Sequence, residues 1–65
     1  MKVEAITTHN VDRIIVDVLT SPATSYWLKL SLQRAIERDP VDAANDVSLL
    51  GSIINARVLQ ANNSV

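Results

Sequence analysis

The chain has 65 residues, of which 48% are hydrophobic, and its six Lys plus Arg against seven Asp plus Glu give a net charge of −1. This hydrophobic content, with one Gly and two Pro, excludes a disordered chain, and the balanced charge argues against nucleic-acid binding, which draws on neutralised phosphates. No Cys is present for disulfides or thiolate metal sites, and one His is too few for a zinc site.

The sequence contains no segment that could span a membrane or form the core of a signal peptide. Its purely apolar runs reach three residues, as at residues 14–16, whereas a membrane helix needs about 20. The lack of Cys also suits a reducing compartment. We therefore expect a cytoplasmic protein of one domain, residues 1–65, that has no contact with a membrane.

The N-terminal residues 1–9 are expected to form an extended arm. Charged and apolar side chains alternate weakly at residues 2–5, which is also compatible with a short strand over residues 1–8. The chain has no second strand candidate, so such a strand could pair only with a copy of itself or with another protein. We favour an arm that lies over the helices.

A first helix is predicted over residues 11–20, with Asn10 as its N-cap. Its apolar residues form one stripe, and its charged residues face away from that stripe. The stripe consists of Val11, Ile14, Ile15, Val18 and Leu19. A helix this short is not stable alone in water, so we expect it to dock on the second helix, at the face of Tyr26, Trp27 and Leu30.

A second helix is predicted over residues 22–38. Ser21 can cap its first turn and Pro22 suits the first helical position, whereas Pro40 pushes the residue before it out of the helical conformation. The apolar residues of this helix lie on two nearly opposite sides. One side consists of Leu28, Leu32, Ala35 and Ile36, and the other consists of Ala23, Tyr26, Trp27 and Leu30, followed by Arg34 and Glu37. Both sides therefore need to be covered.

Tyr26 and Trp27 are the only aromatic residues of the chain. They could belong to the core and cover the first helix, or they could anchor an interface, since aromatics and Arg dominate binding hot spots. We favour the core for Trp27 and give it less weight for Tyr26. Arg34 is expected to lie over this face with its aliphatic stem, or to pair with Glu37 or with an acid of another chain.

A third helix is predicted over residues 40–61, with Asp39 as N-cap, Pro40 at the first position and Asp42 two positions later. Its main stripe is expected to pack against the second helix in an antiparallel αα-hairpin. The main stripe consists of Ala43, Val47, Leu50, Ile54, Val58 and Ala61. Residues 62–65 are expected to fray.

Two further features of the third helix point to close neighbours. Gly51 costs about 1 kcal/mol relative to Ala in a helix interior. It is explained either by the close approach of another backbone or bulky side chain, which we favour, or by a kink. A minor strip consists of Leu49, Ile53 and Ala56 and points away from the expected hairpin contact. This uncovered apolar strip predicts a partner surface.

Candidate catalytic and metal-binding residues are better explained by structural roles. His9 fits a polar loop at the start of a helix, and no nucleophile elbow or Gly-rich oxyanion turn accompanies the Ser and Asp residues. Asp39, Asp42 and Asp46 suit the positive end of a helix dipole, and no calcium-loop pattern follows them. We expect no catalytic, cofactor-binding or metal site, and no enzyme activity.

The order of a possible strand, a short helix and a longer helix is similar to the layout of the ribbon-helix-helix repressors. This resemblance implies a dimeric DNA-binding regulator that inserts residues 1–8 into the major groove. The resemblance covers the layout alone. Lys2 and Glu4 would present one basic and one acidic side chain per chain to the DNA. The turn at residues 21–25 lacks Gly, and the third helix is longer than the minimal family pattern. DNA binding is therefore the alternative interpretation.

The sequence predicts an all-α protein: a small three-helix bundle with a long αα-hairpin, a short N-terminal helix and an extended arm. We expect a homodimer, because burial barely offsets chain entropy in a domain this small. The predicted function is a non-enzymatic protein-protein interaction module, an adaptor or regulator whose partners are itself and an unidentified protein. The candidate contact residues are Tyr26, Trp27, Leu30, Arg34, Leu49, Ile53 and Ala56.

Overall fold

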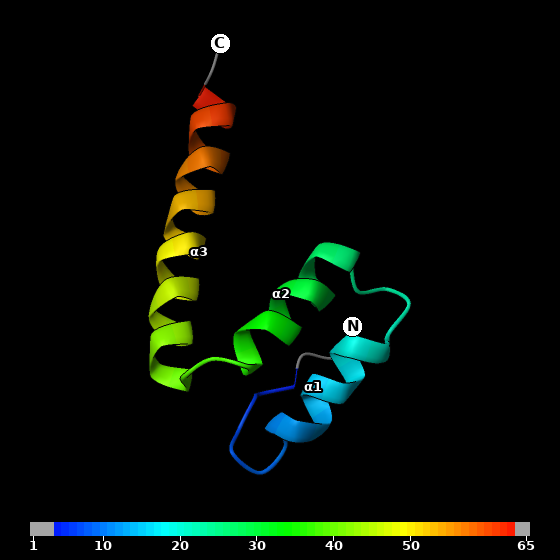
Figure 1. Cartoon of the computed structure of the whole chain (residues 1–65). Coiled ribbons are helices and arrows are strands. Elements are labelled where there is room, and N and C mark those ends of the chain that lie inside the picture. The colour runs from blue at the N-terminus through cyan, green and yellow to red at the C-terminus, as the bar shows by residue number, and fades with distance from the viewer. Residues whose placement is uncertain (1–3, 64–65) are drawn as a thin grey trace. The chain divides into compact units, whose positions relative to one another are not determined.

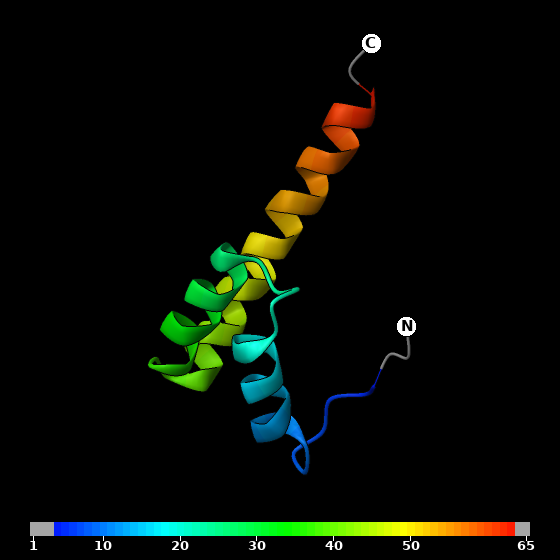
Figure 2. The same ribbon diagram turned by 90° about the vertical axis from the view of Figure 1, so that its right-hand side faces the viewer.

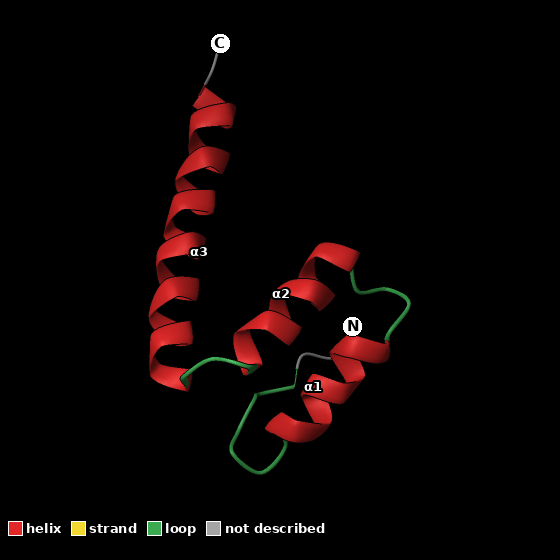
Figure 3. Cartoon of the chain, in the orientation of Figure 1, coloured by secondary structure: helices red, strands yellow, loops and turns green. Residues whose placement is uncertain are grey.

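The computed structural model describes residues 4–63, which contain three α-helices and no strand (Figures 1 and 3). Helix α1 spans Val11–Thr20, α2 spans Tyr26–Ile36 and α3 spans Pro40–Asn63. The predicted all-α class is therefore confirmed. The strand that was the alternative to an arm at residues 1–8 is absent from residues 4–8, and residues 1–3 lie outside the described range.

The chain divides into two compact units, Met1–Ala35 and Ile36–Val65. The boundary falls at the last residue of α2, so α1 and almost all of α2 belong to the first unit, and α3 belongs to the second. The hairpin packing of the second and third helices, the single domain and the homodimer all stay predictions.

Helix α1 has the predicted bounds and the predicted amphipathic pattern. The five residues of its apolar stripe are half-buried, whereas Asp12, Arg13 and Asp17 are exposed. Helix α2 lies next to α1 in both views of the ribbon (Figures 1 and 2). Because a helix of 10 residues is marginal alone, this contact within the first unit is what stabilises α1.

Asn10 occupies the N-cap position of α1, as predicted, but its side chain does not cap the helix. The Asn10 Oδ1 atom instead accepts a hydrogen bond of 2.8 Å from the Thr7 backbone N–H. The Asn10 Nδ2 group donates to the Ala5 carbonyl at 3.0 Å. The side chain therefore holds the arm rather than the first turn of α1.

Helix α2 begins at Tyr26, four residues later than predicted. The reason is that the preceding segment contains two Ser residues and the structure uses them differently. The Ser21 carbonyl accepts from the Thr24 N–H at 3.2 Å, which places Pro22 at the second position of a β-turn, where Pro is as favourable as at a helix start. The Ser25 Oγ atom accepts from the Leu28 N–H at 3.1 Å and is the actual cap of α2. The prediction of Ser21 as the cap was wrong.

Helix α3 begins where the sequence predicted. The Asp39 Oδ2 atom accepts from the Asp42 N–H at 3.2 Å, and the Asp39 carbonyl accepts from the Ala43 N–H at 2.9 Å, so the predicted N-cap is confirmed. This capping geometry takes Asp39 out of the helix, and α2 ends at Ile36 rather than at residue 38. Helix α3 continues to Asn63, two residues beyond the predicted end.

Gly51 does not interrupt α3, which is continuous over its 24 residues, so the alternative of a helix divided at this position is excluded. The close packing favoured from the sequence is also not found within the described residues, since a Cβ atom built at Gly51 would meet no atom within 4 Å. The helix is therefore open to an approaching neighbour at this position.

Replacing Ser25 by Ala is expected to lower the free energy of unfolding by about 1 kcal/mol, because the Leu28 N–H loses its acceptor at the start of α2. Ser21→Ala is the matched control. It removes only the bond from the Ala23 N–H within the preceding turn, and the expected loss is smaller. Urea unfolding followed by circular dichroism measures both variants. A larger loss for Ser21→Ala than for Ser25→Ala would contradict this start of α2.

Candidate protein-interaction surface

The two aromatic residues lie on the first turn of α2 and are exposed to solvent. Tyr26 is 79% exposed and Trp27 is 63% exposed. The expectation that Trp27 belongs to an intrachain core, with α1 docked on the Tyr26 and Trp27 face, was therefore wrong. Because α2 begins at Tyr26, both aromatics sit at the very end of the helix. The half-buried residues of α2 are Lys29, Ser31, Leu32 and Ala35.

Leu30 and Arg34 continue this exposed side of α2 by one and two turns. Leu30 is 37% exposed, and Arg34 is exposed as well. None of the ion pairs within residues 4–63 involves Arg34. The guanidinium is therefore available to a carboxylate or an aromatic ring of a partner.

Helix α3 presents apolar side chains to solvent on more than one side. The minor strip is exposed, with Leu49 at 63% and Ile53 at 50%, and Ala56 is exposed as well. In the main stripe the four large residues Val47, Leu50, Ile54 and Val58 are also exposed. The only buried residue in the described part of the chain is Ala43, at 8%.

Two further apolar residues of α3 are exposed and were not predicted from the sequence as surface residues. Val41 and Leu59 are both exposed, and they were assigned neither to the main stripe nor to the minor strip. Their spacing of 18 residues is five helical turns, so they share one direction of α3. A helical projection of every apolar residue, rather than of the two densest strips, would have found them.

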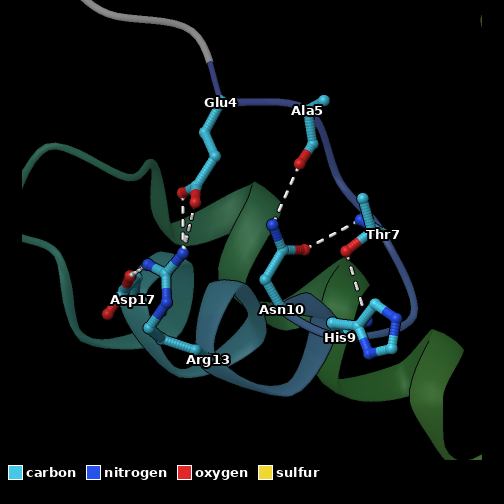
Figure 4. Close-up of polar contacts among 7 residues, drawn as sticks. All are labelled: Glu4, Ala5, Thr7, His9, Asn10, Arg13 and Asp17. Carbon is cyan, nitrogen blue, oxygen red and sulfur yellow. Dashed lines mark hydrogen bonds and ion pairs between the residues drawn. The ribbon is translucent and has the colours of Figure 1, made fainter.

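The N-terminal arm is held on α1 by an ion pair that the sequence analysis did not predict (Figure 4). The Arg13 Nη2 atom lies 2.7 Å and 2.6 Å from the two carboxylate oxygens of Glu4. The Arg13 Nη1 atom lies 2.9 Å from Asp17 Oδ2, one turn along α1. One guanidinium therefore bridges an acid of the arm and an acid of the helix, which its planar fork of donors permits.

His9 takes part in the same loop only through its backbone, as far as the described contacts extend (Figure 4). Its N–H donates to the Thr7 Oγ1 atom at 3.2 Å, and the residue is exposed. The Thr7 carbonyl accepts from the N–H groups of Asn10 and Val11. This arrangement explains the polar residues around His9 by the local backbone alone.

Acidic residues at the start of α3 are engaged in local contacts. Asp39 caps the helix, and Asp46 Oδ2 accepts a charge-assisted hydrogen bond of 2.6 Å from Arg38 Nη1. Within residues 4–63, no group of three or more His, Cys, Asp or Glu side chains could hold a metal ion. The same range contains no helix with the length and apolar character needed to cross a membrane.

Comparison of the chain with protein-family models, with curated proteins and with solved structures finds no match. The most prominent features of the molecular surface are the exposed aromatic turn of α2 and the exposed apolar residues of α3. Whether the seven candidate contact residues bind a partner stays a prediction.

The pKa of Glu4 is expected to lie below its ordinary range, because Arg13 donates hydrogen bonds to the carboxylate and attracts its charge. A carboxylate with a lowered pKa contributes stability above its unfolded pKa, and that contribution is lost as the pH falls through the lowered folded pKa. Acid should therefore release the arm from α1. An NMR titration of the Glu4 carboxyl group measures the pKa directly.

Arg13→Gln is the control for this titration, because it keeps a polar side chain but removes the charge. In this variant the pKa of Glu4 is expected to return to the ordinary range. High salt should shift the wild-type pKa in the same direction, since the pair is exposed and screened. An ordinary pKa of Glu4 in the wild-type chain would contradict the ion pair.

Proposed function

We propose that this chain is a non-enzymatic protein-protein interaction module, an adaptor or regulator that acts through exposed helical surfaces. The observation that carries the proposal is the exposure of α3, whose 24 residues include one buried residue. A helix cannot cover its own side chains. Exposed apolar area of this extent is typical of a surface that binds another protein.

The minor strip of α3 is the first of two docking surfaces in this proposal. Leu49, Ile53 and Ala56 recur at spacings of four and three residues, so they form one narrow line along the helix. This is the pattern by which an amphipathic helix enters the groove of a partner. Covering such side chains contributes about 25 cal/mol for each Å² of apolar surface removed from water.

The first turns of α2 supply the second docking surface. Tyr26 and Trp27 are large, amphipathic and exposed, and Arg34 has no ion pair among the described residues. Trp, Tyr and Arg are the residue types most enriched at the energetic centres of interfaces. We assign this surface to a protein other than the chain itself.

Self-association belongs to the same proposal. A chain of 65 residues is close to the limit at which burial within one copy offsets chain entropy. A second copy that covers apolar side chains of α3 would stabilise both chains by mass action. No observation favours a DNA-binding function, because residues 4–8 contain no strand and the net charge is −1.

Replacing Leu49 and Ile53 together by Asp is expected to weaken partner binding at least tenfold, because two carboxylates would have to be buried without partners. The tagged wild-type chain and the variant are compared by affinity capture from source cells, with quantitative mass spectrometry as the readout. Proteins that are retained by the wild type and lost from the variant identify the docking partner.

The matched control carries Asn55→Asp and Asn62→Asp, which add the same charge to α3 on a different side from the minor strip and remove no apolar side chain. This control should retain the same proteins as the wild type. Equal retention by all three chains would show that the minor strip is not a docking surface. A wild-type chain that is monomeric in light scattering and captures nothing beyond the tag would overturn the proposal.

A further inference from the structure

We propose that α3 pairs with the α3 of a second copy in antiparallel orientation, with the two-fold axis close to Gly51. The inference rests on the proposed function, because it names the surface through which the chain would bind itself. Helix α3 is one continuous element, so the positions of its residues along and around the helix are known regardless of the rest of the chain.

The surface in question is the main stripe with Gly51 beside it. At about 100° per residue, Val47, Leu50, Ile54 and Val58 lie within one arc of about 80°, and Gly51 borders that arc. All four apolar side chains are exposed, and no atom lies within 4 Å of a Cβ built at Gly51. A neighbouring backbone can approach closely at a Gly beside such a face, midway along the helix.

The chain's own α2 is too short to cover this surface. Helix α2 has 11 residues and a length of about 16 Å, whereas α3 has 24 residues and a length of about 36 Å. Three residues connect the two helices, so α2 could reach only the first half of α3 from the shared end. Ile54 and Val58 would remain uncovered. A second α3 has the length and the apolar pattern to cover the whole stripe.

The charges that flank the stripe select the antiparallel orientation. Asp46 and Arg57 lie on the same side of α3, about 20° apart in projection, at five residues before and six residues after Gly51. In an antiparallel pair centred near Gly51, Asp46 of one copy faces Arg57 of the other, and the two-fold axis repeats the contact. A parallel pair in register would place Asp46 and Arg57 opposite the other flank of the stripe, where Ala44, Ser48 and Asn55 carry no charge, so neither side chain would meet an opposite charge.

Both side chains have the capacity for this contact. The Oδ2 atom of Asp46 accepts from Arg38, and a carboxylate with two oxygens can accept from a second guanidinium. No hydrogen bond or ion pair within residues 4–63 involves the Arg57 side chain. The reciprocal pair therefore adds two interchain contacts without breaking an intrachain one.

Two single variants test the arrangement. Asp46→Arg and Arg57→Glu each turn both interchain pairs into like-charge pairs, and each is expected to weaken dimerisation at least tenfold. An equimolar mixture of the two variants should restore the dimer, because the mixed pair has opposite charges at both contacts. Sedimentation equilibrium at low salt measures the three association constants.

Arg38→Gln is the control for the intrachain role of Asp46, since it removes the existing partner and leaves the interchain pair intact. Its dimerisation should match that of the wild type. Restoration in the mixture supports the antiparallel contact, because no intrachain effect can be repaired by a second chain. Circular dichroism of each variant establishes that its helices are retained.

Wild-type dimers that are unaffected by either single variant, or a mixture that stays as weak as its components, would overturn this contact. The proposed function would stand in that case, because its own test depends on partner capture through Leu49 and Ile53. A wild-type chain that stays monomeric at every concentration would also overturn this inference. The affinity-capture experiment with the Leu49 and Ile53 variant then tests the proposed function independently.

Discussion

A helix cannot cover its own apolar side chains, and this constraint governs the whole chain. Helix α1 satisfies it with one stripe, whose residues are half-buried in the first unit. Helix α3 does not satisfy it within the described residues, since its large apolar side chains stay exposed on several sides. Because apolar surface in water is unfavourable, the exposed apolar side chains of α3 are the physical reason to expect partners.

Local signals in the sequence were sufficient to place α1 and the start of α3. Asp39 followed by Pro40 combines a cap with a residue suited to the first helical position, and the Asp39 carboxylate caps the helix in the structure. The start of α2 was misplaced because the preceding segment carries the same kind of signal twice. Pro22 is equally suited to a β-turn and to a first helical turn, so the sequence alone did not distinguish Ser21 from Ser25.

The sequence predicted which residues share a face of a helix, but not how many of these faces are exposed. Periodicity shows which residues share a face of a helix, but it does not show which element covers that face. This is why Trp27 was favoured as a core residue although it is exposed. The ion pair between Arg13 and Glu4 could not be predicted from the sequence for a related reason. Nine residues separate the two side chains, and the path of the arm decides the distance between them.

The position of Trp27 gives the molecule a built-in optical reporter. It is the only indole of the chain, and it lies in water at the exposed end of α2. Indole fluorescence responds to the polarity of its surroundings, and no second Trp contributes a background. A protein that covers this end of the helix would therefore change the colour of the emitted light, whereas contacts confined to other faces would leave it unaltered.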